Sequence, residues 1–214
     1  ADAYDAYNLG LKTDDNYGNA TFKRVSYDNI SKSVRSLNSL NIPVITGFIG
    51  KDDRGEITTM GPNSSDDTAV IFGIALDAEE ILAYKHGNGV LTANPRLVEN
   101  PRTIEYLSHE EAAELSSSGS DVMNATAIML AALKDKRIKV VNLFNPEKFT
   151  LIEGYKDDVD LENALLIKGV ASKEDNTIIT VESSLIVGQE GYAARIYEKI
   201  ASRHRSLDVL TSSG

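Results

Sequence analysis

The 214-residue chain contains no cysteine, which excludes disulfide bonds, cysteine-ligated zinc and thiol catalysis. Histidine is scarce as well. The three that occur, His86, His109 and His204, are not spaced to hold one metal ion from the same helix face. We therefore expect no metal centre built on protein side chains. The nine tyrosines are dispersed, so they offer no platform on which single-stranded nucleic acid would stack.

Long apolar runs are also missing. The longest, residues 69–76, is broken only by Gly73 and is far shorter than the ~20 residues that a membrane-spanning helix requires. We expect no membrane-spanning segment. The first residues, Ala-Asp-Ala-Tyr, show no basic region followed by an apolar one, so we expect no secretory signal among them.

Basic residues are outnumbered, with 22 Lys and Arg against 32 Asp and Glu, which gives a formal net charge of −10. Such a charge repels phosphate backbones and disfavours broad binding to nucleic acid. Local dipoles still allow a small anion to bind. We expect small molecules or other proteins as partners, and no nucleic acid or membrane.

Hydrophobic periodicity and turn residues predict an α/β fold. Strands that alternate with helices favour a parallel sheet with helices on both faces. The expected helices are residues 28–40, 65–76, 108–116, 121–134 and 192–202. The expected strands are residues 42–49, 56–60, 80–84, 90–92, 138–144, 164–170, 177–182 and 207–211.

The composition changes after Ile152. Residues 153–163 are acidic and poorly periodic, which is typical of an interdomain linker. Residues 1–152 then form one domain. Residues 164–214 contain about half of a ferredoxin-like βαββαβ module.

Two loops are candidates for chemistry. Residues 58–66 lie between an expected strand and a helix N-terminus, where free N–H groups and the helix dipole hold phosphate oxygens. A tight turn with Ser65 as N-cap explains the same residues equally well. Residues 85–89 contain two glycines that permit close approach of a flat ligand, and Arg96 follows within reach of phosphate. A solvated hairpin is the simpler interpretation of this second loop.

Four segments in order resemble the aspartokinases, which have the amino acid kinase fold. They are residues 42–48 (IPVITGF), 57–66 (ITTMGPNSSD), 89–96 (GVLTANPR) and 108–115 (SHEEAAEL). The resemblance covers residues 1–152. Residues 166–214 resemble part of the first ACT regulatory domain of the same enzymes, including the segments at 179–181 and 191–197.

The resemblance implies transfer of the ATP γ-phosphate to the side-chain carboxylate of L-aspartate, with ATP and Mg²⁺ as cofactors, in lysine, threonine and methionine biosynthesis. It also implies a lysine or threonine effector, a homodimer formed through ACT domains, and a cytoplasmic location, or a plastid one if a transit peptide precedes the chain. Such transfer depends mainly on positioning and on neutralising charge.

At several positions this sequence departs from the residues typical of the family. The arginine that grips aspartate is replaced by Pro62, and the lysine that serves the nucleotide is replaced by Asp121. The Lys-Phe-Gly-Gly phosphate loop of the family does not occur in this sequence. We therefore expect the chain to lack turnover by itself. A catalytically silent regulatory or amino-acid-binding subunit is the alternative that the same substitutions favour.

The site residues implied by the resemblance fall into three groups, and we assign no catalytic residue. Nucleotide-binding positions are Ser65, Asp66, Lys85, His86, Gly89, Leu91, Pro95, Arg96 and Asp121. Substrate-binding positions are Pro62 and Ser65. Effector-binding positions are Val187, Gly188, Gln189, Glu190 and Gly191.

Overall fold

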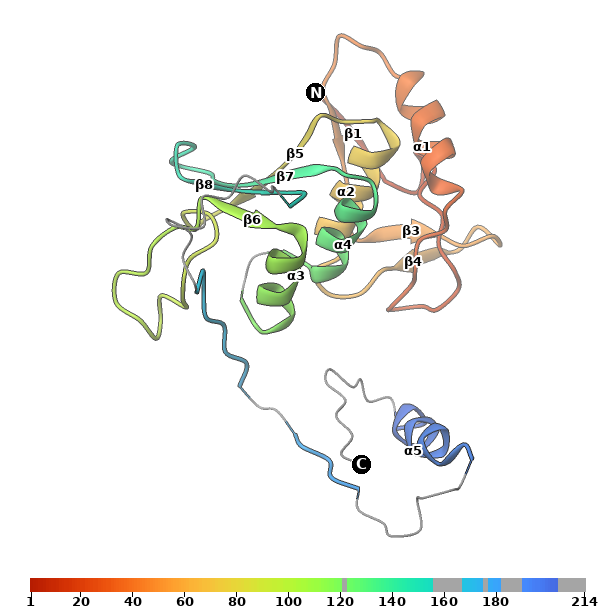
Figure 1. The fold of residues 1–214 in the computed structure, drawn as a ribbon. Coiled ribbons are helices and arrows are strands. Elements are labelled where there is room, and N and C mark those ends of the chain that lie inside the picture. Colours follow the sequence, from red (N-terminus) through yellow and green to blue (C-terminus); the bar gives the residue numbers. More distant parts are fainter. Residues whose placement is uncertain (121–122, 156–166, 175–176, 182–189, 204–214) are drawn as a thin grey trace. The chain divides into compact units, whose positions relative to one another are not determined.

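The computed structural model describes residues 1–120, 123–155, 167–174, 177–181 and 190–203. The chain divides into two compact units, residues 1–174 and 175–214 (Figure 1). Within the described residues, no helix combines the length and the apolar character needed to cross a membrane.

The first unit contains four helices and eight strands among its described residues. The helices are α1 (Ser26–Arg35), α2 (Ser65–Ala75), α3 (His109–Ser117) and α4 (Ala125–Leu133). The strands are β1 (Asp2–Tyr4), β2 (Pro43–Ile45), β3 (Ile49–Lys51), β4 (Ile57–Thr59), β5 (Glu80–Lys85), β6 (Tyr106–Ser108), β7 (Arg137–Asn142) and β8 (Phe149–Glu153).

The largest sheet has four strands in the order β5-β7-β8-β6. β5 pairs parallel with β7 and β6 parallel with β8, but β7 and β8 are antiparallel. The sheet is therefore mixed, and the expectation of an all-parallel sheet is wrong at this pair. The reason is that residues 143–148 reverse the chain directly, whereas a parallel connection needs a longer crossover.

Two further sheets have two strands each: β1 pairs parallel with β2, and β3 antiparallel with β4. The expected strand over 42–49 is thus split in two, because Phe48 has a positive φ of 75° that an extended strand does not allow. Residues 90–92 form only an isolated bridge, between Leu91 and Thr103.

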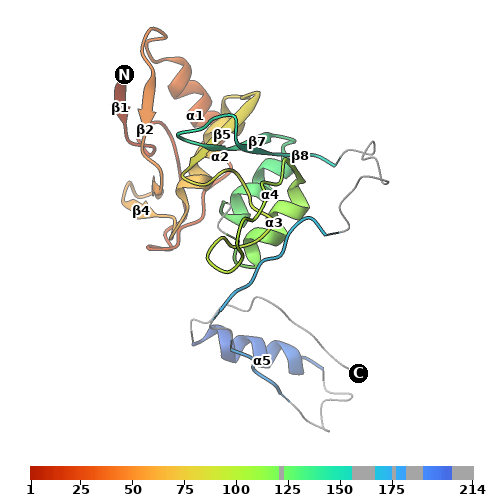
Figure 2. The same ribbon diagram turned by 90° about the vertical axis from the view of Figure 1, so that its left-hand side faces the viewer.

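The main core lies between the four-stranded sheet and α2, α3 and α4. Alternate strand residues such as Ile81, Ile138 and Ile152 point to this side and are buried against Val70 and Ile128 of the helices. Figures 1 and 2 show these three helices on the same side of the sheet. The packing places the N-termini of α2 and α4 next to each other.

A second cluster joins α1 to α2 and to the N-terminal segment. It contains Leu9, Leu11, Ile30 and Ile71, all buried. This cluster sets the position of the loop that precedes α2, since α1 packs directly on that helix.

In the second unit, α5 (Tyr192–Ala201) confirms the expected helix at 192–202. The described residues 167–170, which belong to the first unit, and 177–181, which belong to the second, form no strands, contrary to our expectation. A strand is held by hydrogen bonds to a neighbouring strand, and none of the strands that the structure describes pairs with these residues. The expected strand at 207–211 and His204 lie outside the described residues.

Candidate active site

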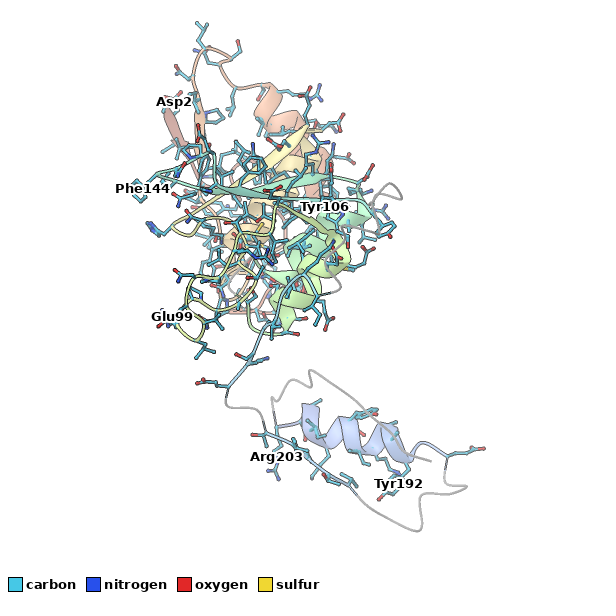
Figure 3. The ribbon with its side chains drawn as sticks, turned by 60° about the vertical axis from the view of Figure 1, so that its left-hand side comes forward. Asp2, Glu99, Tyr106, Phe144, Tyr192 and Arg203 are labelled. Atoms are coloured by element: carbon cyan, nitrogen blue, oxygen red, sulfur yellow. The ribbon has the colours of Figure 1, made fainter. Side chains whose placement is uncertain are left out.

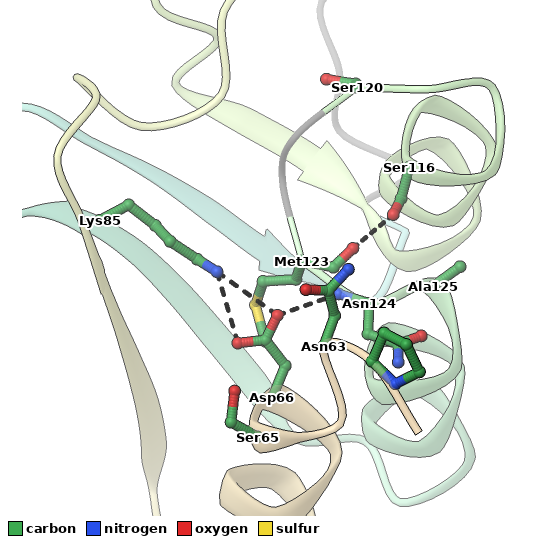
Figure 4. Close-up of a pocket in the computed structure, with 10 residues that line it drawn as sticks. Asn63, Ser65, Asp66, Lys85, Ser116, Ser120, Met123, Asn124 and Ala125 are labelled. Atoms are coloured by element: carbon green, nitrogen blue, oxygen red, sulfur yellow. Dashed lines mark hydrogen bonds and ion pairs between the residues drawn. The ribbon is translucent and has the colours of Figure 1, made fainter. Parts of the chain in front are cut away.

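A pocket of about 400 Å³ opens where the N-termini of α2 and α4 meet the carboxyl end of β5 (Figure 4). In open α/β sheets, ligands bind beyond the carboxyl ends of the strands. The pocket is lined by Pro62, Asn63, Ser65, Asp66, Lys85, Ser116, Ser120, Met123, Asn124 and Ala125.

The loop before α2 is held in a strained but well-bonded conformation. Gly61 and Asn63 have positive φ angles of 93° and 63°. The Ser64 hydroxyl donates to the Gly61 carbonyl at 2.8 Å, and the Thr68 hydroxyl donates to the Ser64 carbonyl at 3.1 Å. Ser64 is the residue before the helix, so the expectation that Ser65 is the N-cap is wrong by one position. Ser65 instead opens the helix and lines the pocket.

Asp66 links three elements at the centre of the pocket. Its carboxylate accepts the backbone N–H of Asn124 at 3.0 Å, which ties α2 to the start of α4. Both of its oxygens lie 3.4 Å from the Lys85 ammonium, at the end of β5. Figure 4 shows these contacts converging on one carboxylate.

Asn124 is the N-cap of α4. Its side-chain oxygen accepts the N–H of Thr126 at 3.0 Å, and its amide nitrogen donates to the Asp67 carboxylate at 3.1 Å. We expected a helix from residue 121 and did not identify Asn124 as a site residue. The sequence feature that could have identified it is an asparagine directly before an alanine-rich run, which is typical of a helix N-cap.

Asp67 is 7% exposed, and its Oδ1 has no hydrogen-bond partner within the described part of the chain. Burial, together with the neighbouring Asp66 charge, raises the pKa of Asp67 to about 6. A carboxylate in this environment is costly to ionise.

The pocket brings together four of the residues proposed from the sequence: Pro62, Ser65, Asp66 and Lys85. It does not include His86, Gly89, Leu91, Pro95 or Arg96. Asp121, Val187, Gly188 and Gln189 lie outside the described residues. Glu190 and Gly191 are exposed, and Gly191 precedes α5 with a φ of 72°.

The loop after β5 is bonded to the end of β7. The His86 ring stacks on Phe144, with 5.9 Å between ring centroids, and Phe144 projects from this end of the sheet (Figure 3). Asn142, at the end of β7, donates to the Asn88 side chain at 2.7 Å and to the His86 carbonyl at 3.3 Å. These bonds hold the loop beside Lys85. Arg96 is exposed, and its backbone N–H donates to the Asn94 side chain at 2.9 Å.

His109, in the first turn of α3, is buried. It is 3% exposed, and its Nε2 lies 3.0 Å from the Lys136 carbonyl. His109 faces the segment that contains Lys136 instead of solvent. This contact cannot be recognised from the sequence of α3 alone.

Comparisons with known proteins identify relatives. The family model described as "Amino acid kinase family" matches residues 4–142. Aspartokinase 2, chloroplastic, of Arabidopsis thaliana is 33% identical over 214 residues, which covers 98% of this chain and 39% of that protein. The chain therefore spans about two fifths of that relative.

Two solved structures are similar. Clostridium acetobutylicum aspartate kinase is 31% identical with a TM-score of 0.61, over 72% of this chain and 34% of that one. Escherichia coli aspartokinase III in complex with aspartate and ADP has a TM-score of 0.79 at 22% identity, over 99% of this chain and 46% of that one. This second match confirms the α/β fold class of the amino acid kinases.

Proposed function

The chain belongs to the amino acid kinase family, and from that premise we propose that it is the nucleotide-binding half of an aspartokinase polypeptide. The whole protein would transfer the ATP γ-phosphate to the side-chain carboxylate of L-aspartate, early in lysine, threonine and methionine biosynthesis. The proposal draws support from relatives that are named aspartokinase and aspartate kinase.

The observation that carries it is the pocket between two helix N-termini. Free N–H groups and the positive dipole ends of α2 and α4 favour phosphate oxygens. Lys85 adds an ammonium at the same point. A lysine binds phosphate as a point charge. Lys85 is therefore suited to replace the lysine that the family has at the position of Asp121.

Mg²⁺ is bound by one or two carboxylates together with substrate phosphates. Within the described residues, no group of three or more His, Cys, Asp or Glu side chains is arranged to hold a metal alone. Asp66 is the carboxylate that lines the pocket, and it suits a metal that arrives with its nucleotide. When bound, Mg²⁺ would neutralise charge on the transferred phosphate.

We propose further that this chain alone has no turnover. Pro62 offers no charge to an aspartate carboxylate, although it does line the pocket. The Asp66 carboxylate accepts the Asn124 N–H and pairs with the Lys85 ammonium, so it occupies the two groups that would otherwise bind a ligand anion. This internal pairing favours the second candidate, a catalytically silent regulatory subunit.

Residues 164–214 are proposed to be part of an ACT domain, joined to residues 1–152 by a linker at 153–163. The proposed effector is lysine or threonine, bound near residues 187–191, and the proposed assembly is a homodimer formed through these domains. A solved relative is described as a complex with lysine and aspartate. The proposed location is cytoplasmic or plastid, since one relative is named chloroplastic.

Calorimetric titration of ADP with Mg²⁺ tests the nucleotide half. Saturable binding that falls about tenfold in Lys85→Gln, but not in the exposed control Lys148→Gln, supports it. Binding that occurs only after Asp121→Lys supports the silent subunit. Absence of binding in the unmodified chain, in Asp121→Lys and in Asp66→Asn would overturn the nucleotide assignment.

Turnover is tested separately by ADP release in the presence of aspartate. We expect none from this chain, so measurable aspartate-dependent release would contradict the proposed inactivity while leaving nucleotide binding intact.

A further inference from the structure

A second pocket lies at the opposite end of α4 from the first. It has a volume of about 430 Å³ and is lined by Phe22, Arg24, Tyr27, Leu130, Leu133 and Lys134. We call it the α1–α4 pocket. It shares no lining residue with the candidate active site, and none of its residues carries a role in the proposed kinase chemistry.

The wall of the α1–α4 pocket is apolar and aromatic. The rings of Phe22 and Tyr27 meet edge to face, with centroids 5.6 Å apart and planes at 67°. This arrangement fixes both rings and leaves ring surface for a third group. Leu130 is partly buried, whereas Leu133 is 76% exposed and contributes apolar surface that no described residue covers.

The rim is cationic. Arg24 and Lys134 are exposed, and neither forms an ion pair with another described residue. The described lining contains no carboxylate, although the chain as a whole carries a net charge of −10. The two cations on the rim of this pocket therefore differ in sign from the net charge of the protein.

The Tyr27 hydroxyl is the third polar group among the side chains that line the α1–α4 pocket, after Arg24 and Lys134. It forms no hydrogen bond to any part of the chain that the structure describes. Burial raises the pKa of Tyr27, whereas the charge of Arg24 lowers it, so the hydroxyl is a neutral donor within the field of that guanidinium. A carboxylate accepts hydrogen bonds from both kinds of group.

We propose that the α1–α4 pocket binds a small carboxylate that carries an apolar ring, with the ring against Phe22, Tyr27 and Leu133 and the carboxylate between Arg24 and Lys134. The volume falls within the range of small-molecule sites. Predominantly apolar walls with a few polar groups at one point are also characteristic of such sites. Charge complementarity selects an anion over a cation or a neutral molecule of the same shape.

The test uses 3-phenylpropanoate as the probe, with 3-phenylpropanol and 3-phenylpropylamine as neutral and cationic analogues of the same ring and chain. Calorimetry on the full chain is expected to give saturable binding of the acid, with at least tenfold weaker binding of the alcohol and the amine. Arg24→Gln and Lys134→Gln should each weaken binding of the acid about tenfold. Lys32→Gln, a lysine of α1 outside the pocket, should leave it unchanged.

Because Arg24, Leu133 and Lys134 are exposed, their replacement does not disturb the core, and circular dichroism verifies each variant. Leu133→Ser should weaken the binding of the acid and of the alcohol to the same extent, because it removes contacts with the ring and does not change the charge. Equal affinity for the acid and the alcohol, an equal loss in Lys32→Gln, or no saturable binding would overturn the proposal. A dimer that dissociates in Leu133→Ser would overturn it as well, since a second copy would then occupy the pocket.

Discussion

The backbone N–H of Asn124 donates to the Asp66 carboxylate across 3.0 Å, so the first turn of α4 is bonded to the first turn of α2. The two residues are 58 positions apart in the chain. Together with the bond from the Asn124 amide to the Asp67 carboxylate, this contact holds the two helix N-termini of the candidate active site side by side. The candidate site is thus shaped by a carboxylate that already occupies part of it.

Replacing Asn124 by alanine should destabilise the chain by about 1–2 kcal/mol. The substitution removes the cap on Thr126 and leaves the buried Asp67 carboxylate without its amide donor. Urea unfolding measures the change. Asn124→Ser keeps a capping oxygen and should recover part of the loss. Equal stability of Asn124→Ala and the unmodified chain would show that the cap contributes nothing.

Asp67 should make stability fall as the pH rises through about 6. Its pKa of about 6 in the folded chain lies above the ordinary value of 3.8, so the folded state binds the proton more tightly than the unfolded state. The stabilisation from the neutral form is complete below about pH 4 and is lost above the folded pKa.

The variant that isolates this effect is Asp67→Asn, which keeps an oxygen for the Asn124 amide. We expect it to be more stable than the unmodified chain at pH 8, with a difference that shrinks as the pH is lowered to 5. Glu99→Gln, which removes an exposed carboxylate, is the control (Figure 3). A pH-independent difference between Asp67→Asn and the unmodified chain would contradict the assignment.

Asp52 should have the opposite effect on the pH dependence of stability, because its pKa is lowered in the folded chain. It is 2% exposed at the β3–β4 turn, and burial alone would raise its pKa. The Glu56 N–H, the Tyr17 hydroxyl and Arg54 donate to its carboxylate and outweigh burial, which lowers the pKa of Asp52 to about 2. Its contribution to stability is complete above about pH 4 and is lost as the pH falls through 2.

Asp52→Asn should therefore destabilise the chain at pH 7 and much less near pH 2. Denaturant unfolding at both pH values checks this expectation. Tyr17→Phe, which removes one donor to the carboxylate, should show a smaller effect of the same sign. If Asp52→Asn has the same effect at both pH values, the carboxylate charge is not what stabilises the turn.

Features that depend on neighbouring residues could be predicted from the sequence. The helix expected at 108–116 is confirmed, and its Ser108–Glu111 capping box shows why: both partners lie within one helical turn and their hydrogen bonds need no other element. The start of α2 was predicted within one residue, because the acidic residues Asp66 and Asp67 of its first turn are a local signal. Asp66 and Lys85 were both proposed for one ligand, and the pocket contains both because strand ends and helix starts meet at one edge of the sheet.

Features that depend on distant residues were missed. Nothing near Asp52 in the sequence marks it as buried, because Tyr17, which donates to its carboxylate, lies 35 positions away. The strands β6 and β8 were not predicted, because each is short: β6 is held by pairing with β8, and β8 lies between β6 and β7. No local pattern contains that information, since the strength of a short strand comes from its neighbours.

Gly89 should be intolerant of any side chain. Its φ is 74°, a conformation that favours glycine, and an added Cβ would lie 2.7 Å from the Thr150 hydroxyl and 2.9 Å from the backbone of Phe149. The Thr150 hydroxyl cannot move freely, because it accepts the Val90 N–H at 2.7 Å and donates to the Ile104 carbonyl at 2.6 Å. We expect Gly89→Ala to destabilise the chain by more than about 1 kcal/mol, as strain at positive φ and backbone contact combine.

The matched control is Gly87→Ala in the same loop. An added Cβ there would meet only the Gly89 carbonyl, at an ordinary contact distance of 3.8 Å, so Gly87→Ala should be close to neutral in urea unfolding. A similar loss in both variants would mean that the loop resists alanine in general. A loss confined to Gly89→Ala would mean that Gly89 is required by its contact with β8, and would explain why a loop that looks like a solvated hairpin in the sequence is held against the sheet.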